Sequence, residues 1–177
     1  HGSESEKIDP IIEKADRSAN EGSTFGVDNY GHWTFQVGLG DSWEQLWIKS
    51  GDVIDTYEWN HLTAVFDGDN GLLQLYKNGS KVAEKSVPTG TITSASPALK
   101  LGRNRRMDYI GEGANVWKQN MFNGAVSQLE TYDAALSATE VQSKHDEEVG
   151  DLPATGYQEL TVNPQQYDDD NFRPEYH

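Results

Sequence analysis

Residues 58–81 read EWNHLTAVFDGDNGLLQLYKNGSK, and this stretch decides the fold. One face of its first run collects three apolar side chains: Leu62, Ala64 and Phe66. This period of two predicts a strand. After a glycine-rich turn, Leu72–Lys77 predicts a second strand, and Asn78-Gly79 is the dipeptide that tight hairpins prefer, because both positions need positive φ. The stretch therefore predicts a three-stranded antiparallel meander that runs to about Glu84.

Composition bounds the class of protein. The 177 residues suit one domain with a possible tail, and 17 Gly with few long helical patterns argue for an all-β fold. The 29 acidic residues outnumber the 14 basic ones, which gives a net charge of −15. This field repels phosphate, so nucleic acid and anionic membranes are disfavoured partners. No run approaches the ~20 apolar residues of a membrane span. The absence of Cys decides nothing about the compartment.

The rest of the chain alternates strand and turn signals. Further strands are predicted at these ranges: Ile8–Ala15, Thr24–Asn29, Trp33–Leu39, Trp43–Lys49, Leu99–Gly102 and Met121–Tyr132. Asp16–Ser23 is predicted as a polar loop, and 103–119 is the longest irregular segment. Ser137 and Glu140 form a capping box, which predicts a short helix to about Glu148.

Three spaced motifs carry a resemblance to a known family. They are Trp59-Asn60-His61-Leu62 with the hairpin that follows, Leu99-Lys100-Leu101-Gly102-Arg103, and Phe122-Asn123-Gly124-Ala125-Val126 with the helix start after it. Together they resemble the laminin-G-like, concanavalin-A-like jelly rolls from about Pro10 to Val141. The resemblance implies an all-β, two-sheet antiparallel jelly-roll sandwich over residues 1–149, with one short helix near 138–148. This fold hosts lectins, adhesion modules and enzymes, so it does not fix the function.

The end of the chain carries a second resemblance. Residues 150–177 are rich in breakers and acids and predict a linker toward a following catalytic domain. Arg173-Pro174-Glu175-Tyr176-His177 is similar to the entry sequence of glycoside hydrolase family 32 catalytic domains, which act on fructans such as levan, inulin and sucrose. In that family the nucleophilic Asp comes later than this point. The resemblance implies a secreted bacterial parent enzyme, a fructan hydrolase or a related fructosyltransferase.

Candidate carbohydrate ligands are aromatic and charged side chains, because a flat apolar ring can stack on a sugar while polar neighbours bind its hydroxyls. The candidates are Trp43, Trp47, Tyr109, Trp117, Arg103, Arg105 and Asp108. Trp117 can equally anchor its loop in the core, Trp47 can be covered by a second sheet, and the arginines, Arg106 among them, can pair with the acidic surface. Trp33 and Trp59 lie in alternating runs, which favours core packing for both.

Metal and catalytic signals are weak. Asp67, Asp69 and Asn70 have the spacing of oxygen ligands for calcium, but the same residues make an ordinary turn. No other cofactor is required. Glycoside hydrolysis needs two carboxylates at a defined separation, and no motif selects a pair. We therefore expect this chain to be non-catalytic.

These observations favour a non-catalytic carbohydrate-binding module of a fructan-acting enzyme, with a polysaccharide or oligosaccharide as partner and the rest of the same precursor as neighbour. One alternative is a structural jelly roll that packs on the catalytic domain without binding sugar. Another is an independent lectin or adhesion domain.

The front of the chain carries one more expectation. In domains that this chain resembles, some fifty residues precede a run like Pro10–Ala15 and supply the first strands, whereas nine mostly polar residues precede it here. Missing strands would leave unpaired edges and an open apolar face. We therefore expect a fragment whose absent strands come from another polypeptide, most simply the N-terminal piece of the same precursor. The alternative is a shortened sandwich closed by Tyr157–Val162.

Overall fold

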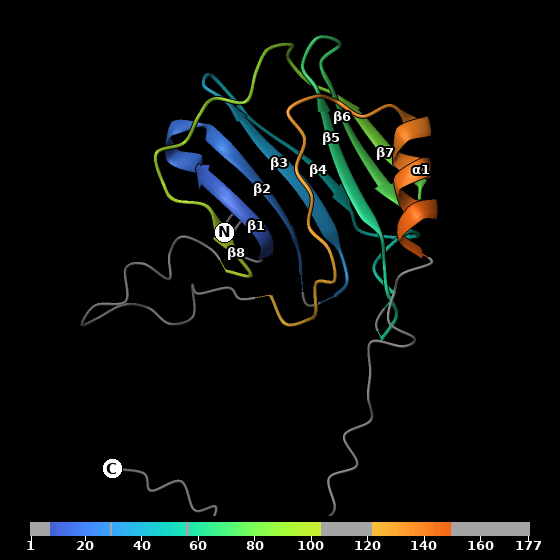
Figure 1. The fold of residues 1–177 in the computed structure, drawn as a ribbon. Helices are drawn as coiled ribbons and strands as arrows, with labels where there is room; N and C mark the ends of the chain where they lie inside the picture. Colours follow the sequence, from blue (N-terminus) through green and yellow to red (C-terminus); the bar gives the residue numbers. More distant parts are fainter. Residues whose placement is uncertain (1–7, 29, 56, 104–121, 150–177) are drawn as a thin grey trace, which may run out of the picture.

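The computed structural model describes residues 8–28, 30–55, 57–103 and 122–149. These residues form two antiparallel sheets that face each other, with one helix outside them (Figure 1). The two-sheet, all-β architecture with a single short helix confirms the predicted fold class. Within the described residues, no helix has the length and apolar character needed to cross a membrane.

The larger sheet has five strands in the order β4-β3-β2-β1-β8. Its strands are β1 (Asp9–Asp16), β2 (Glu21–Val27), β3 (Trp33–Leu39), β4 (Trp43–Ile48) and the two-residue β8 (Lys100–Leu101). The predicted loop between the first two strands is shorter than expected. A single 3-10 turn, η2 (Arg17–Ala19), replaces most of it, and β2 begins at Glu21 because Asn20 takes a positive φ of 55° and reverses the chain.

The smaller sheet is the predicted meander, β5 (Leu62–Asp67), β6 (Leu72–Lys77) and β7 (Ser80–Ser86), in that order. The hairpin turn is built as predicted, since Asn78 and Gly79 have φ values of 50° and 77°. Within the described residues β5 pairs with β6 only, so it forms one edge of this sheet.

The core lies between the two inner faces. Its centre is Trp33 of β3, Ile48 of β4 and Leu75 of β6, and Trp33 and Leu75 are fully buried. The indole Nε1 of Trp33 donates to the carbonyl of Asp52 at 2.9 Å, which satisfies its polar atom. The prediction that Trp33 packs in the core is confirmed. Strand alternation explains which side chains of β3 enter this core, because the odd-numbered residues of the strand face inward.

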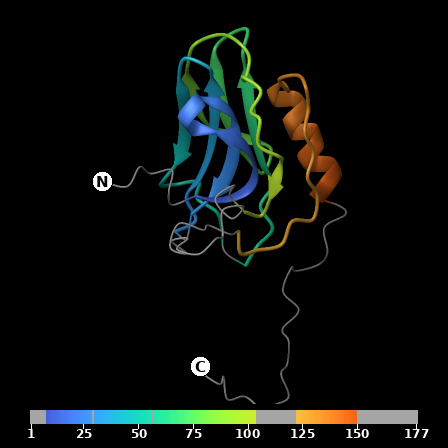
Figure 2. The ribbon, with the colours of Figure 1, turned by 90° about the vertical axis from the view of Figure 1, so that its left-hand side faces the viewer.

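The helix α1 (Ala138–Val149) covers the outer face of the smaller sheet (Figure 2). The predicted capping box is present: Ser137 N–H donates to Glu140 Oε2 at 2.7 Å, and Glu140 N–H donates to Ser137 Oγ at 3.3 Å. Val141, fully buried, packs against Val65 and Tyr76. The helix therefore buries the apolar side chains that β5 and β6 turn away from the core.

One predicted strand is wrong. The described part of Met121–Tyr132, residues 122–132, forms no strand, although it runs as an extended segment toward α1. At the start of this part, Phe122 N–H donates to the carbonyl of Gly102 at 2.9 Å. Its residues are mostly exposed, so its apolar residues at 122, 126 and 129 do not pack as the pattern suggested.

Candidate functional site

A polar and aromatic patch lies on the outer face of the five-stranded sheet. Trp43, Gln45 and Trp47 alternate along β4 and therefore project to one side, away from the buried Ile48. The residues opposite them on β3 are Gly38, Gln36 and Thr34, in that order. We call the set Trp43, Gln45, Trp47, Gln36 and Thr34, with Arg17 above it, the β4 patch.

Gln36 is the centre of the β4 patch. Its side chain is fully buried, and its Oε1 accepts a hydrogen bond from Trp43 Nε1 at 3.1 Å and another from the guanidinium of Arg17. Arg17 also lies over the indole of Trp43, with Cζ 4.8 Å from the ring centroid. These contacts fix the orientation of the Trp43 indole, because the side-chain amide of Gln36 binds both the indole Nε1 and the Arg17 guanidinium that lies over the ring.

The turn η2 brings Arg17 to this place. Gly38, the residue opposite Trp43, has the backbone of Asn20 packed on it, since an added Cβ would lie 2.2 Å from the Asn20 carbonyl oxygen. A glycine is therefore required at this position, and the close approach carries η2 over the outer face. The patch thus depends on residues from three neighbouring segments of the chain: η2, β3 and β4.

The second indole is held less tightly. Trp47 Nε1 donates to Gln45 Oε1 at 3.4 Å, and Lys49 Nζ lies 5.2 Å from its ring centroid. Thr34, opposite Trp47, donates its hydroxyl to the Leu46 carbonyl at 2.8 Å. Both indoles are half-buried. Aromatic rings beside amide and hydroxyl groups are the combination that can stack on a sugar and bind its hydroxyls.

The predicted site residues are only partly brought together. Trp43 and Trp47 share the β4 patch, but Arg103 follows β8, which is the opposite edge of the same sheet. The remaining predicted ligands lie outside the described residues: Arg105, Asp108, Tyr109 and Trp117, with Arg106 beside them. Trp59 is half-buried at the rim of the cavity described below, and its Nε1 is buried without a hydrogen-bond partner among the described residues.

The predicted calcium ligands take part in a turn. Asn70 donates its backbone N–H to Asp67 Oδ1 at 3.0 Å and its side-chain Nδ2 to Asp67 Oδ2 at 2.7 Å. The hydrogen bonds from Asn70 lower the pKa of the Asp67 carboxyl. Both carboxylate oxygens of Asp67 are thus engaged by the turn. Within the described ranges, no group of three His, Cys, Asp or Glu residues is arranged to hold a metal.

Sequence reasoning missed Gln36, Gln45 and Arg17. The signal for Gln36 was present, because it is a polar residue in an outward position between Trp33, Phe35 and Val37 of an alternating strand. Gln45 similarly lies between the two indoles. No signal identified Arg17, since its place over Trp43 depends on how η2 folds back onto β3.

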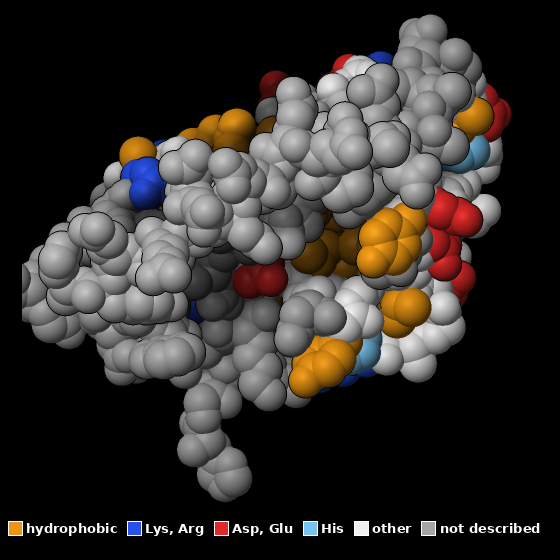
Figure 3. Space-filling model, turned by 90° about the horizontal axis from the view of Figure 1, so that it is seen from below, with side chains coloured by type: hydrophobic (Ala, Val, Ile, Leu, Met, Phe, Trp, Pro, Cys, Tyr) orange, Lys and Arg blue, Asp and Glu red, His pale blue; other side chains and the backbone are white. Residues whose placement is uncertain are grey.

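Apart from the β4 patch, a hollow lies between the two sheets (Figure 3). Its volume is about 1640 Å³, and it opens beside β5. Its walls are the inner faces of β1, β2 and β3, the strand β5, residues 122–136 and the last turns of α1. Both hydrophobic and acidic side chains line it. We call it the inter-sheet cavity.

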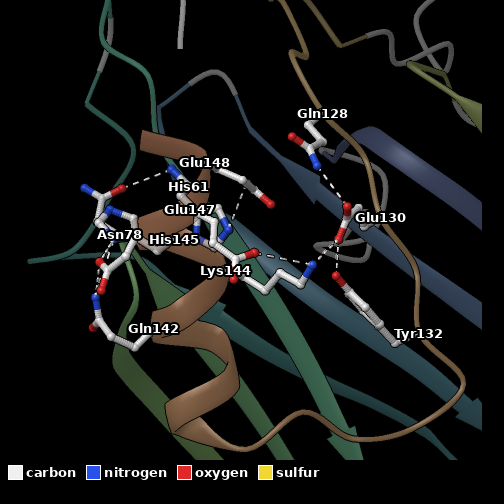
Figure 4. Close-up of polar contacts among 11 residues, drawn as sticks. His61, Asn78, Gln128, Glu130, Tyr132, Gln142, Lys144, His145, Glu147 and Glu148 are labelled. Carbon is white, nitrogen blue, oxygen red and sulfur yellow. Dashed lines mark hydrogen bonds and ion pairs between the residues drawn. The ribbon is translucent and has the colours of Figure 1, made fainter. Parts of the chain in front are cut away.

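Polar contacts join α1 to β5 near this cavity (Figure 4). His61 Nε2 lies 3.4 Å from Glu148 Oε2, and the rings of His61 and His145 are 5.5 Å apart. The Nδ1 of His61 is buried and has no partner among the described residues. Burial lowers the pKa of His61 and the adjacent His145 lowers it further, although Glu148 acts in the opposite direction. This imidazole is therefore favoured in its neutral form.

Nearby, Glu130 connects residues 122–136 to the helix. It accepts hydrogen bonds from Tyr132 Oη and, at 2.8 Å, from Gln128 Nε2, and it lies 3.5 Å from Lys144 Nζ. The hydrogen bonds from Tyr132 and Gln128 lower the pKa of Glu130. All these groups are largely exposed, so the contacts orient the segment more than they stabilise it.

Comparisons with known proteins found similar solved structures. The chain resembles the crystal structure of the native heptameric SAP-like pentraxin from Limulus polyphemus, with a TM-score of 0.51, 21% identity, and coverage of 78% of this chain and 66% of that one. An S-layer domain-containing protein (residues 221–444) from Clostridium thermocellum gives a TM-score of 0.41, 20% identity, and coverage of 78% and 63%. The chain thus spans just under two thirds of each of these structures. No curated protein matches it.

The family model provides the assignment. It matches residues 3–142, which include every strand and the start of α1. The pentraxin supports the fold alone, since its identity to this chain is low. The chain belongs to the concanavalin A-like lectin/glucanases superfamily, in its laminin-G-like branch.

Proposed function

We propose that this chain is a non-catalytic carbohydrate-binding module and that the β4 patch is where it binds sugar. The observation that carries the proposal is the arrangement of Trp43 and Trp47 on one face of β4, with Gln36, Gln45 and Arg17 between and above them. Two indoles four residues apart on a strand are about 13 Å apart along it. That spacing suits a chain of linked sugars better than a single monosaccharide.

The nature of the side chains supports the same proposal. Gln36 is buried and holds two donors, so the patch is pre-organised before any ligand arrives. Carbohydrate hydroxyls need both donors and acceptors, and the half-buried side-chain amide of Gln45 offers both kinds of group. Membership of a superfamily named for lectins and glucanases agrees with this chemistry.

We propose further that the module serves a secreted bacterial enzyme that acts on fructans. The sequence Arg173–His177 supports this, because it is similar to the start of family 32 glycoside hydrolase domains. A tethered module would raise the effective concentration of such an enzyme on a long polymer. In this proposal the chemistry belongs to the enzyme and the module supplies only binding.

Affinity electrophoresis of the chain in gels containing levan, inulin or unrelated glucans tests the proposal. We expect retardation in the fructan gels, and a loss of about tenfold or more in affinity for Trp43→Ala and Trp47→Ala. Tyr30→Ala is the matched control, because Tyr30 is a 72% exposed aromatic residue outside the patch. Equal mobility in every gel would refute sugar binding. Retardation by glucans alone would refute the fructan assignment but would still support a carbohydrate-binding module.

An alternative is a structural jelly roll that packs on a neighbouring domain without binding sugar. Large apolar side chains on the surface favour it, since Leu99, Leu101 and Val126 are 54%, 58% and 50% exposed. Equal mobility in every gel, together with specific binding of a family 32 catalytic domain, would support this alternative.

A further inference from the structure

The free edge of β5 faces the inter-sheet cavity. Asn78 N–H donates to the His61 carbonyl at 2.8 Å, and hydrogen-bonded pairs alternate along antiparallel strands from that point. The backbone groups of Leu62, Ala64 and Phe66 therefore point away from β6. No described residue pairs with them, so a row of amides and carbonyls lines one side of the cavity.

The cavity is too large to be a packing defect. Protein interiors contain few voids larger than a water molecule, whereas this hollow measures about 1640 Å³. Its floor consists of inner-face residues of both sheets, including Phe25, Phe35 and Leu62. An apolar floor of this kind is poorly suited to a polar sugar. It is suited to apolar side chains that alternate along a strand, because such a strand would present one face to the floor.

The lining of the cavity also includes apolar side chains that are exposed to solvent. They are Leu99, Val126 and Leu129, with exposed fractions of 54%, 50% and 42%. An occupant of the cavity could cover apolar surface of this kind in addition to the floor.

The charges that line the cavity favour an occupant that carries basic residues. Among the described residues that line the cavity, eight are acidic and two are lysines. Asp55, Asp67 and Glu148 belong to this acidic set and come from separate segments of the chain. Basic residues at the ends of an occupant would match this field, which acts over about 10 Å at moderate salt.

We propose that the inter-sheet cavity is an acceptor site for a β-strand from another polypeptide segment, and that this strand pairs with the outer edge of β5. The incoming strand alternates apolar and polar residues, turns its apolar face toward Phe25 and Phe35, and carries Lys or Arg at its ends. Pairing of this kind is β-strand addition, in which backbone hydrogen bonds give affinity and alternate side chains give specificity. The site is separate from the β4 patch and does not depend on sugar binding.

Hydrogen exchange of the 177-residue chain tests the pairing, with a short synthetic peptide as the probe. The peptide alternates valine and threonine and ends in lysine on both sides. Without it, we expect the amides of Leu62, Ala64 and Phe66 to exchange quickly and those of Thr63, Val65 and Asp67 to be protected. With it, the first set becomes protected. A scrambled peptide of the same composition is expected to protect neither set further.

A proline variant tests the same edge by calorimetry. Ala64→Pro removes an amide that points into the cavity, while the ladder to β6 keeps its hydrogen bonds. We expect this variant to bind the peptide about tenfold or more weakly. Ser86→Pro is the matched control, because Val87 N–H donates to the Gly71 carbonyl at 2.9 Å and Ser86 therefore points its N–H outward from the other edge of the sheet. Its affinity is expected to be unchanged.

Three results would overturn the proposal. The first is the absence of saturable peptide binding by the unmodified chain. The second is binding that Ala64→Pro and Ser86→Pro affect equally. The third is protection of Leu62, Ala64 and Phe66 in the chain alone. In that case, sedimentation would show whether a second copy fills the cavity, and deletion of Tyr157–Val162 would show whether the chain fills it itself.

Discussion

The faces and edges of the two sheets are covered in different ways. The five-stranded sheet packs Trp33 on its inner face and covers its outer face with its own long side chains, such as Arg17 over Trp43. The three-stranded sheet needs α1 to cover its outer face, and β5 keeps a free edge within the described residues. The comparison shows that a sheet can have a well-packed face and still be incomplete, because faces are closed by side chains and edges by another backbone.

This difference between the two sheets predicts which substitutions lower the free energy of unfolding most. We expect Trp33→Ala to lower the free energy of unfolding by about 3–5 kcal/mol, because this indole is fully buried at the centre of the core. Phe66→Ala on β5 should cost less, since Phe66 is half-buried and borders the inter-sheet cavity. Urea unfolding of both variants measures the two losses. An equal or greater loss for Phe66→Ala would contradict the open edge.

The dependence of the smaller sheet on α1 can be tested with two valines of the same helix. Val141→Ala should destabilise by about 2 kcal/mol, because Val141 is fully buried against Val65 and Tyr76. Val149→Ala should have almost no effect, since Val149 is 50% exposed. Chemical denaturation compares them. Similar losses for the two variants would mean that the helix does not dock through Val141.

The N-terminal cap of α1 should contribute less to protein stability than the packing of the helix on the smaller sheet. Ser137→Ala removes the side chain that caps Glu140 N–H, and we expect a loss of about 1 kcal/mol. Ser143→Ala is the control, because Ser143 is exposed within the same helix and alanine is the better helix former. Thermal unfolding of both variants reports the difference. A Ser137→Ala variant as stable as the control would show that the cap is not needed.

The smallest expected effect is a pH dependence at the contact between α1 and β5. The pKa of His61 is lowered mainly by burial, so its stabilising contribution is present above the unfolded pKa of about 6.5 and is lost as pH falls toward and through the lower folded pKa. The facing groups are Glu148 and His145 of α1. Unfolding midpoints from pH 7.5 to pH 5 should therefore fall more for the unmodified chain than for His61→Gln.

His32→Gln provides the control for that series. His32 lies 2.8 Å from Asp28 at the start of β3 and makes no contact with α1. Because this variant also removes one imidazole, comparison of the two variants separates loss of the contact with α1 from loss of a histidine as such. If His61→Gln kept the full pH dependence, titration of another group would have to account for it.

Local patterns were enough to predict most of the elements. Alternation predicted β3, β5 and β6, the Asn78-Gly79 turn predicted the hairpin, and Ser137 with Glu140 predicted the start of α1. These signals succeed because each depends on neighbours within a few residues. The segment 122–132 had the same kind of pattern but formed no strand in its described part, because a strand also needs a partner for its backbone.

The candidate site was predicted only in part for the same reason. The sequence identified Trp43 and Trp47 as a possible sugar platform, since aromatic residues on an alternating strand can be recognised locally. It did not identify Arg17, whose place over Trp43 requires the close approach of Asn20 to Gly38. It also gave no relation between Arg103 and the tryptophans, and the strand order puts Arg103 at the other edge of the sheet.

The sequence by itself therefore determined the period of each strand, the turns and the helix cap, all of which follow from short-range stereochemistry. Only the tertiary structure decided which face of each strand was covered, which edge stayed free and which polar side chains met at Gln36. These properties depend on contacts between residues far apart in the chain, such as Arg17 with Gln36 or Val141 with Val65, and on whether a backbone finds a partner. No local pattern contains that information, because the same alternating segment can be a central strand, an edge or an unpaired segment.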